Sequence, residues 1–261
     1  MATSLIGGIC TQGDISAKQI WVYEPNSDKA HALANEFDIN IAQDNSDLIA
    51  NSNIVVIAVK PQVLQSVLSP VVASFRQAKP LIISIVAGIT ATSIEKWLED
   101  PYAIIRVMPN TPALVGMGAS GLYANQRVSQ EQRKNAELLC DSIGTSTWVQ
   151  SESDIDTVTA LSGSGPAYFM LFIQGLIEAA QAAGLSHESA KLLATQTAAG
   201  AAHLVANTDS PLQTLIDNVT SPNGTTEKAL QSFNNANLKP IIGNAFEAAR
   251  KRSEELAKEL G

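Results

Sequence analysis

Ile54-Val55-Val56-Ile57-Ala58-Val59 is an unbroken apolar run, and Pro80-Leu81-Ile82-Ile83-Ser84-Ile85-Val86 is almost as apolar. Runs rich in β-branched residues are typical of strands buried on both faces of a parallel sheet. Further strands are expected at Gln19–Tyr23 and Ala103–Met108, and helices at Asp28–Glu36 and Pro61–Phe75. This alternation predicts an α/β fold with a Rossmann-like, doubly wound parallel sheet.

The composition changes at about Asp154, where Ala, Leu, Gln and Glu become dominant and β-branched runs disappear. Helices are expected at Phe169–Ala183, His187–Ala206 and Asn244–Leu260. Two domains follow: a Rossmann-like domain at residues 1–153 and an all-α domain at residues 154–261. Small residues in Thr197–Ala202 allow close helix packing, either inside one subunit or against a second one.

The bulk properties favour a small-molecule enzyme. The 261-residue chain has a formal net charge of -8 and lacks a Lys/Arg cluster before its last helix, which argues against nucleic-acid binding. Neither cysteine belongs to a Cys-x-x-Cys pair, and no histidine has partners at metal spacing, so no metal site is predicted. With no basic leader and no apolar run near the roughly 20 residues of a membrane-spanning helix, we expect a cytoplasmic protein without membrane partners.

The glycine turn of a dinucleotide site is expected just before this chain. In a Rossmann unit that turn holds the pyrophosphate, and an acidic residue ends the second strand about 20 residues later. Glu24 occupies the acidic position, so counting back leads past Met1. Met1–Gly8 is then the first crossover helix without its opening strand, and the natural protein is expected to begin upstream. A non-catalytic remnant that only dimerises is the alternative.

Two glycine-rich segments occur elsewhere. Gly116–Gly121 matches G-x-G-x-x-G but opens no helix, so it lacks the helix N-terminus that binds pyrophosphate. Gly163-Ser164-Gly165-Pro166 is a better turn, because proline suits the first helical position. Its free N–H groups are expected either to face a ligand or to form an ordinary helix start.

Four motifs together carry a family resemblance: Ala58-Val59-Lys60-Pro61-Gln62, Arg106-Val107-Met108-Pro109-Asn110-Thr111-Pro112, Leu161-Ser162-Gly163-Ser164-Gly165-Pro166-Ala167-Tyr168 and Asp217-Asn218-Val219-Thr220-Ser221-Pro222-Asn223-Gly224-Thr225-Thr226. In this order the chain resembles pyrroline-5-carboxylate reductase. The resemblance implies a Rossmann-type NAD(P)H-binding domain, a helical domain that forms a homodimer, and in some members a larger ring. It also implies that Met1 is the last residue of the family's Gly-x-Gly-Asn-Met turn.

The resemblance further implies the roles of single residues. Val59, Lys60 and Pro61 follow a strand against the cofactor, Asn45 is similar to a residue on its phosphate or ribose side, and Ala87 to one near the nicotinamide. Asn110 is similar to a residue that shapes the hydride-transfer pocket. Ser221, Asn223, Gly224, Thr225 and Thr226 resemble the loop that binds the substrate carboxylate.

One residue of that loop departs from the family, since Asn223 stands where glycine is usual. Asparagine tolerates a left-handed backbone best among the other residues, so we expect the loop to be kept. The implied reaction reduces the C=N bond of 1-pyrroline-5-carboxylate to give L-proline. Thr226 is expected to be catalytic, donating a hydrogen bond or relaying a proton to the imine nitrogen. Helix capping by Thr225 and Thr226 is the alternative.

The cofactor and the reaction each have a competing interpretation. Glu24 would repel a ribose 2′-phosphate and favours NADH, whereas the resemblance and Lys29 favour NADPH. A related reductase of β-hydroxy acids would carry a catalytic lysine on the first long helix of the second domain. The expected helix from Tyr168 to Ala183 contains no lysine, which argues against that enzyme.

Overall fold

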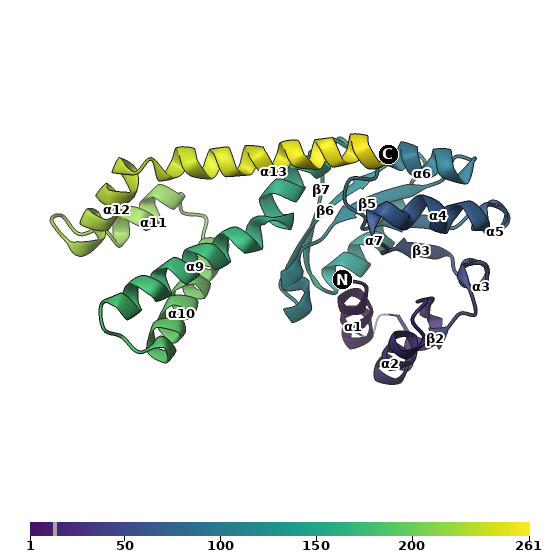
Figure 1. The fold of residues 1–261 in the computed structure, drawn as a ribbon, viewed down its shortest axis with the longest axis horizontal. Coiled ribbons are helices and arrows are strands. Elements are labelled where there is room, and N and C mark those ends of the chain that lie inside the picture. Colours follow the sequence, from purple (N-terminus) through teal and green to yellow (C-terminus); the bar gives the residue numbers. More distant parts are fainter. Residues whose placement is uncertain (13–14) are drawn as a thin grey trace. The chain divides into compact units, whose positions relative to one another are not determined.

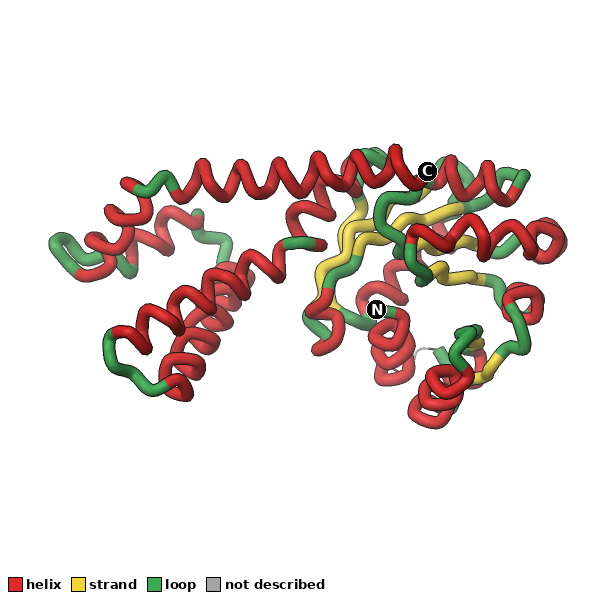
Figure 2. Tube along the Cα trace, viewed as in Figure 1, coloured by secondary structure: helices red, strands yellow, loops and turns green. Residues whose placement is uncertain are grey.

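The computed structural model describes residues 1–12 and 15–261, which form two compact units. One unit comprises Met1–Ser164 with Ala248–Gly261, and the other comprises Gly165–Glu247. The strands of the described residues all belong to the first unit, and the second consists of helices and loops (Figure 1 and Figure 2). The expected fold class, an α/β domain followed by an all-α one, is confirmed.

A five-stranded sheet forms the centre of the first unit. Its strands, in spatial order, are β3 (Ile54–Ile57), β4 (Leu81–Ser84), β5 (Ile104–Met108), β6 (Gly118–Ala124) and β7 (Gly144–Trp148). Strands β3, β4 and β5 are parallel, β6 is antiparallel to β5, and β7 is parallel to β6. The short strands β1 (Trp21–Val22) and β2 (Asn40–Ile41) pair in parallel as a separate sheet. The sheet was expected to be parallel throughout, but the antiparallel pairing of β6 with β5 makes it a mixed sheet.

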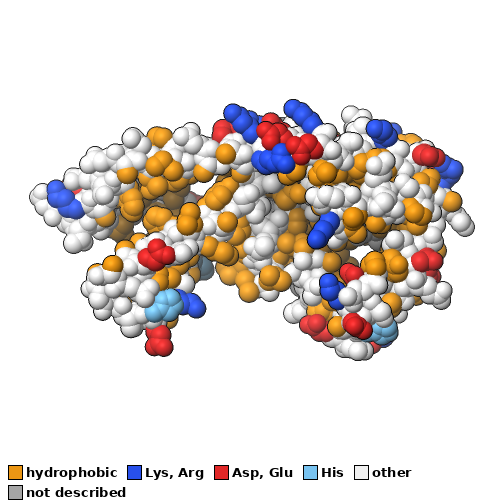
Figure 3. Space-filling view, viewed as in Figure 1, with side chains coloured by type: hydrophobic (Ala, Val, Ile, Leu, Met, Phe, Trp, Pro, Cys, Tyr) orange, Lys and Arg blue, Asp and Glu red, His pale blue; other side chains and the backbone are white. Residues whose placement is uncertain are grey.

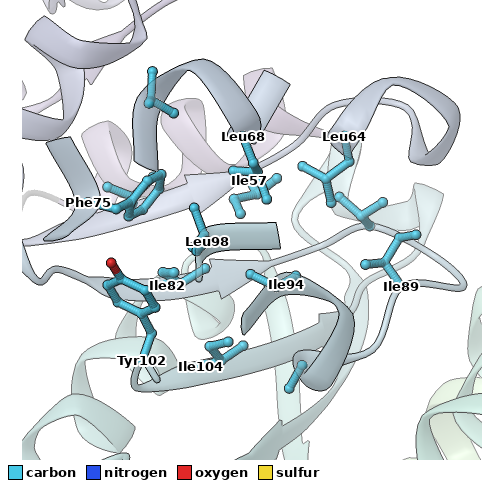
Figure 4. Packing of buried hydrophobic residues seen from close by; sticks show 14 of the residues in the cluster. Ile57, Leu64, Leu68, Phe75, Ile82, Ile89, Ile94, Leu98, Tyr102 and Ile104 are labelled. Carbon is cyan, nitrogen blue, oxygen red and sulfur yellow. The ribbon is translucent and has the colours of Figure 1, made fainter. Parts of the chain in front are cut away.

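Helices cover both faces of the five-stranded sheet. Ile82 of β4 packs with residues of α4, α5 and α6 such as Leu64, Phe75 and Ile94 (Figure 4), whereas Leu81 and Ile83 pack with residues of α7. This alternation is the two-residue period of a strand buried on both faces. The helices of this unit are α1 (Ala2–Gln12), α2 (Ser27–Phe37), α3 (Asn45–Ala50), α4 (Leu64–Leu68), α5 (Val72–Ala78), α6 (Ala91–Leu98), α7 (Gln130–Asp141) and α8 (Asp154–Val158).

Two expectations about these elements are wrong. Val56 is 40% exposed, so β3 is not buried on both faces as β4 is. The reason is that β3 is the end strand of its sheet, and an apolar hollow lies beside Val56. Pro61–Phe75 is not one helix, because 3₁₀ turns at Pro61–Val63 and Ser69–Val71 interrupt it. Pro70 lies in the second turn and lacks the N–H that a continuous helix needs.

The second unit is built from α9 (Gly165–Ala182), α10 (His187–Ala206), α11 (Leu212–Asn218), α12 (Thr225–Asn235) and the first part of α13 (Leu238–Leu260). The helix expected at His187–Ala206 is confirmed as α10, and α1 confirms the helix expected at the start of the chain. Inside this unit the rings of Phe172 and Phe233 lie 6.0 Å apart, which joins α9 to α12. Helix α13 continues into the first unit, where its last turns belong.

Candidate functional site

The residues expected to bind the cofactor follow the carboxyl ends of three neighbouring parallel strands. Val59 and Lys60 come after β3, Ala87 after β4 and Asn110 after β5. Because parallel strands end at one edge of their sheet, these positions share that edge, where α/β proteins bind nucleotides. Val59 packs on the core, while Lys60 is exposed and precedes the 3₁₀ turn that begins at Pro61. These positions therefore lie at the edge of the sheet where a nucleotide-binding site is expected in this fold.

The Asn110 side chain forms hydrogen bonds with two other segments of the chain. Its side chain is buried, and its Oδ1 accepts a hydrogen bond from the N–H of Ala119 at 2.9 Å. Its Nδ2 donates to the carbonyl of Ser162 at 3.0 Å. An asparagine amide can make further bonds, but these two already fix its orientation. Asn110 thus links the end of β5 to the start of β6 and to the segment before α9.

The loop from Ile85 to Thr90 carries Ala87. Gly88 has φ +71°, a left-handed conformation that glycine adopts without strain. At the end of the loop the Thr90 hydroxyl accepts a hydrogen bond from the N–H of Ser93 at 3.1 Å and caps α6. Ala87 itself is half-buried between buried neighbours. The left-handed Gly88 and the capping Thr90 thus shape the second half of this loop.

A buried ion pair beneath this edge was not anticipated from the sequence. Arg106 in β5 donates from Nη1 to Oε1 of Glu152 at 3.1 Å, and its side chain is only 5% exposed. The same oxygen accepts from the N–H of Ala91, the first residue of α6, at 2.6 Å. Glu152 therefore ties β5 to the end of the Ala87 loop. The sequence held one signal of this ion pair. Arg106 is a charged residue inside the apolar run of β5, and a buried charge needs a partner.

Glu24 and Asn45 lie near the small two-stranded sheet. Glu24 follows β1, and its carboxylate accepts from the N–H of Asn26 at 3.0 Å. Asn26 in turn caps α2 by accepting from the N–H of Lys29. Asn45 is the half-buried first residue of α3, next to the capping Asp44. Glu24 therefore follows the parallel strand β1, and its carboxylate is oriented by the N–H of Asn26.

The expected substrate loop lies in the second unit, between α11 and α12. Asn223 has φ +58°, so its predicted left-handed backbone is confirmed. The Gly224 N–H donates to the carbonyl of Ser221 at 2.9 Å, and the Asn223 N–H donates to Glu227. Gly224 is the N-cap of α12 and has no side-chain cap. Its backbone is close to Ser221, whose carbonyl oxygen would lie 2.9 Å from an added Cβ.

The start of α12 has no side-chain cap, and its first turn contains Glu227. Thr225 and Thr226 are its first two residues, so neither threonine occupies the capping position. The capping alternative for these threonines is therefore wrong. The first N–H groups of a helix have no partner within the helix and attract carboxylates. Thr225 is exposed and Thr226 half-buried.

The two glycine-rich segments lie in a strand and at a helix start. Gly118–Gly121 lies in strand β6, so the G-x-G-x-x-G match opens no helix, as predicted. Gly163–Pro166 is not an open turn. Thr159–Gly163 forms a π-helical turn, the Ser164 N–H donates to the Thr159 carbonyl at 2.8 Å, and α9 begins at Gly165. The expectation of free N–H groups facing a ligand there fails for Ser164.

Comparison with known proteins assigns the chain to a family. A family model described as pyrroline-5-carboxylate reductase dimerisation matches residues 152–256, and one described as NADP oxidoreductase, coenzyme F420-dependent, matches residues 1–88. A pyrroline-5-carboxylate reductase of Pseudomonas aeruginosa is 43% identical over 261 residues, which cover 100% of this chain and 95% of that protein. The chain belongs to the pyrroline-5-carboxylate reductase family.

Solved structures of pyrroline-5-carboxylate reductases are similar to this chain along almost its whole length. A pyrroline-5-carboxylate reductase of Coxiella burnetii superposes with a TM-score of 0.93 at 38% identity, over 98% of this chain and 94% of that one. A Plasmodium falciparum pyrroline carboxylate reductase with NADP bound has a TM-score of 0.86 at 34% identity, over 97% and 93% of the two chains. Such full-length similarity to reductases does not favour the alternative of a non-catalytic remnant.

Proposed function

We propose that the chain catalyses the NAD(P)H-dependent reduction of 1-pyrroline-5-carboxylate to L-proline, the last step of proline biosynthesis. The observation that carries this proposal is the similarity to named reductases along the whole chain, at 43% identity to the protein of Pseudomonas aeruginosa. Two features of the fold support it: the strand-end edge with Val59, Ala87 and Asn110, and the uncapped start of α12.

Substrate binding is assigned to the loop before α12. The substrate carboxylate would accept hydrogen bonds from the N–H groups of Thr225 and Thr226 and from the Ser221 hydroxyl, because a helix N-terminus favours an anion. Asn223 and Gly224 give the loop its left-handed turn and its close approach to Ser221. This loop would position the pyrroline ring of the substrate and would not activate it chemically.

The reaction adds a hydride to the carbon of the C=N bond and leaves a proton on the nitrogen. When bound, NAD(P)H supplies the hydride. A cyclic imine is protonated readily, so orientation contributes more than a strong acid does. We assign to Thr226 the catalytic role of donating a hydrogen bond, or relaying a proton, to the imine nitrogen. The side chains around Ala87 and Asn110 would shape the pocket on the nicotinamide side.

We assign the binding of the adenosine half to Glu24 and Asn45, and that of the nicotinamide half to Val59, Lys60, Pro61, Ala87 and Asn110. The NADP-bound structure of the Plasmodium falciparum relative supports NADPH as the donor. Glu24 opposes a 2′-phosphate by its charge and keeps NADH as an alternative. The ratio of kcat/KM for the two nucleotides decides between them.

A homodimer is proposed from the apolar surface of the second unit (Figure 3). Phe169, Met170 and Leu171 of α9 are 74%, 61% and 70% exposed, and Leu192 of α10 is 68% exposed. By length and composition alone, the helical segment Asp154–Ala182 could cross a membrane, and only 11% of its most apolar stretch is buried. Such a surface marks an interface. The matched dimerisation model favours a second copy of this chain as its partner over a membrane.

Three further assignments accompany this proposal. The dinucleotide-binding part is assigned to residues 1–153 and the dimerisation and substrate part to residues 154–261. Dimers would assemble into a larger ring, as in some members of the family. The cytoplasm is the proposed compartment, where the substrate and NAD(P)H are both soluble small molecules.

Replacement of Thr226 tests the mechanism. Thr226→Ala is expected to lower kcat by about 10²-fold or more, the usual contribution of a positioned proton donor, with the Kd of NAD(P)H unchanged. Thr226→Ser keeps the hydroxyl and should retain most of the activity. An unchanged kcat in Thr226→Ala would remove the catalytic role from this residue.

A further inference from the structure

The Ile85–Thr90 loop begins directly beside Arg106. Strand β4 ends at Ser84, immediately before the loop, and Ser84 is the register partner of Arg106 in β5. Both residues lie on the face of the sheet that α4, α5 and α6 cover, because Ile82 and Ile104, two positions earlier in each strand, belong to that core. Arg106 and the last residue of β4 therefore share one face at the point where the loop leaves the sheet.

The same loop ends at the partner of Arg106. Ala91, the first residue of α6, donates its N–H to Oε1 of Glu152 at 2.6 Å. Nη1 of Arg106 donates to that same oxygen at 3.1 Å. Glu152 comes from the turn between β7 and α8. One carboxylate oxygen from a distant part of the chain thus joins the strand beside the beginning of the loop to the residue just after its end.

The middle of the loop has no polar side chain of its own. Val86 and Ile89 are buried in the core. Between them, Ala87 is half-buried and Gly88 has the left-handed φ of +71°. Neither alanine nor glycine has a side-chain group that can form a hydrogen bond. The position of Ala87 therefore depends on where the flanking residues of the loop are held.

The contacts of Glu152 are strong ones, because they are charged and largely shielded from water. The Arg106 side chain is 5% exposed and that of Glu152 24% exposed, and Ala91 is buried. Hydrogen bonds with an ionised partner are roughly twice as strong as neutral ones, and a buried N–H group needs an acceptor. Loss of the carboxylate would leave both the Ala91 N–H and the Arg106 guanidinium without it, and would release the end of the loop.

We propose that Glu152 is a positioning residue for nicotinamide-nucleotide binding. It holds the Ile85–Thr90 loop through its hydrogen bonds with Arg106 and Ala91. Ala87 is thereby presented to the nicotinamide. This inference rests on the proposed function, because it takes Ala87 as a residue of the cofactor pocket. Glu152 acts through the loop and is assigned no contact with substrate or cofactor.

Three variants of the full chain separate this role from a loss of stability. Glu152→Ala removes the carboxylate, whereas Glu152→Gln keeps an oxygen that can accept from the Ala91 N–H. Phe75→Ala is the control, because it empties a buried position in α5 without touching the ion pair. Phe75 lies beside Tyr102, shortly before β5, on the other side of the core cluster from Ile89 (Figure 4).

Each variant is studied below its own unfolding midpoint. The Kd values of NADPH and NADH are measured from nucleotide fluorescence, and the amides of residues 85–91 are followed by hydrogen exchange. The KM values of nucleotide and imine are measured beside them. Binding and exchange require no turnover, so they report on the loop independently of the reaction.

Glu152→Ala is expected to speed exchange in the loop and to raise the Kd of both nucleotides about tenfold, since Kd rises as the binding-competent loop becomes less populated. One tenfold step corresponds to about 1.4 kcal/mol, close to the contribution of one hydrogen bond to a charged group. The nucleotide KM should rise in parallel while the imine KM stays within about twofold, as a loss of cofactor binding alone requires. Glu152→Gln should show a smaller rise in Kd. Phe75→Ala should lower the thermal midpoint and leave Kd within about twofold of the unmodified chain.

A nucleotide Kd that rises equally in Glu152→Ala and Phe75→Ala would overturn the proposal. So would faster loop exchange in Glu152→Ala with an unchanged Kd. Should the unmodified chain bind nucleotide but reduce no imine, the proposed reaction would fail, whereas the Kd values would still decide the role of Glu152. An unmodified chain that binds neither nucleotide would overturn both.

Discussion

The ion pair between Arg106 and Glu152 gives the sharpest stability prediction. Glu152→Ala removes the partner of a guanidinium whose side chain is 5% exposed and also the acceptor of the Ala91 N–H. Breaking a buried pair from one side costs about 3–5 kcal/mol, because the remaining charge stays buried and unpaired. The lost acceptor alone accounts for about 1–3 kcal/mol of that range. Against a typical stability of about 5–15 kcal/mol, the loss is large.

Urea denaturation at one fixed protein concentration, followed by circular dichroism, measures this loss. The midpoint should fall with an unchanged m-value. Glu152→Gln keeps an oxygen for the Ala91 N–H and should lose less. Glu259→Ala is the matched control, because Glu259 pairs with Arg252 on the surface and exposed pairs contribute about 0–1 kcal/mol. A loss in Glu152→Ala no larger than that of Glu259→Ala would refute the reasoning.

Three other outcomes are expected. Phe169→Asp should convert the dimer into monomers in sedimentation analysis, whereas Phe169→Leu should keep it dimeric; a dimeric Phe169→Asp would count against this interface. Asn223→Val should lower stability by about 1–3 kcal/mol and raise the imine KM, because a β-branched residue is strained at positive φ, whereas Asn223→Gly should preserve both. Burial, and secondarily the charge of Asp141, raises the pKa of the Cys140 thiol from an unfolded value of about 9 to about 12. The folded state then retains a proton that the unfolded state loses, so this contribution to stability is complete below about pH 9 and falls with rising pH by about 1.4 kcal/mol per unit. Cys140→Ala should lack that slope in its own profile of stability against pH, so the slope should appear in the difference between the unmodified chain and the variant; identical slopes in the two profiles would disprove it.

The sequence predicted those parts of the fold that rest on local patterns. The β-branched runs located β3, β4 and β5, because buried strands and amphipathic helices have different periods. The composition change at about Asp154 predicted that a helical unit follows, but the compact helical unit begins at Gly165 and ends at Glu247. Strands β6 and β7 were missed, since Gly118–Ala124 and Gly144–Trp148 are rich in small and hydroxylated residues. Their identity as strands depends on pairing with β5 and with each other.

The site shows the same division. Asn223 was predicted correctly because a left-handed residue in a turn restricts the choice of amino acid. The partners Arg106 and Glu152 are far apart in the chain and share no spacing pattern. Only the folded chain brings them together. The motifs supplied the proposed site residues, and the structure supplied the long-range contacts near them.

The proposed function is the formation of L-proline from 1-pyrroline-5-carboxylate by this chain. The direct measurement incubates the chain with 1-pyrroline-5-carboxylate and NADPH or NADH, then quantifies L-proline by chiral chromatography beside the loss of reduced nucleotide. L-proline should form mole for mole with the nucleotide oxidised, and Thr226→Ala should form far less of it. A folded dimer that forms no proline with either nucleotide would contradict the proposed function.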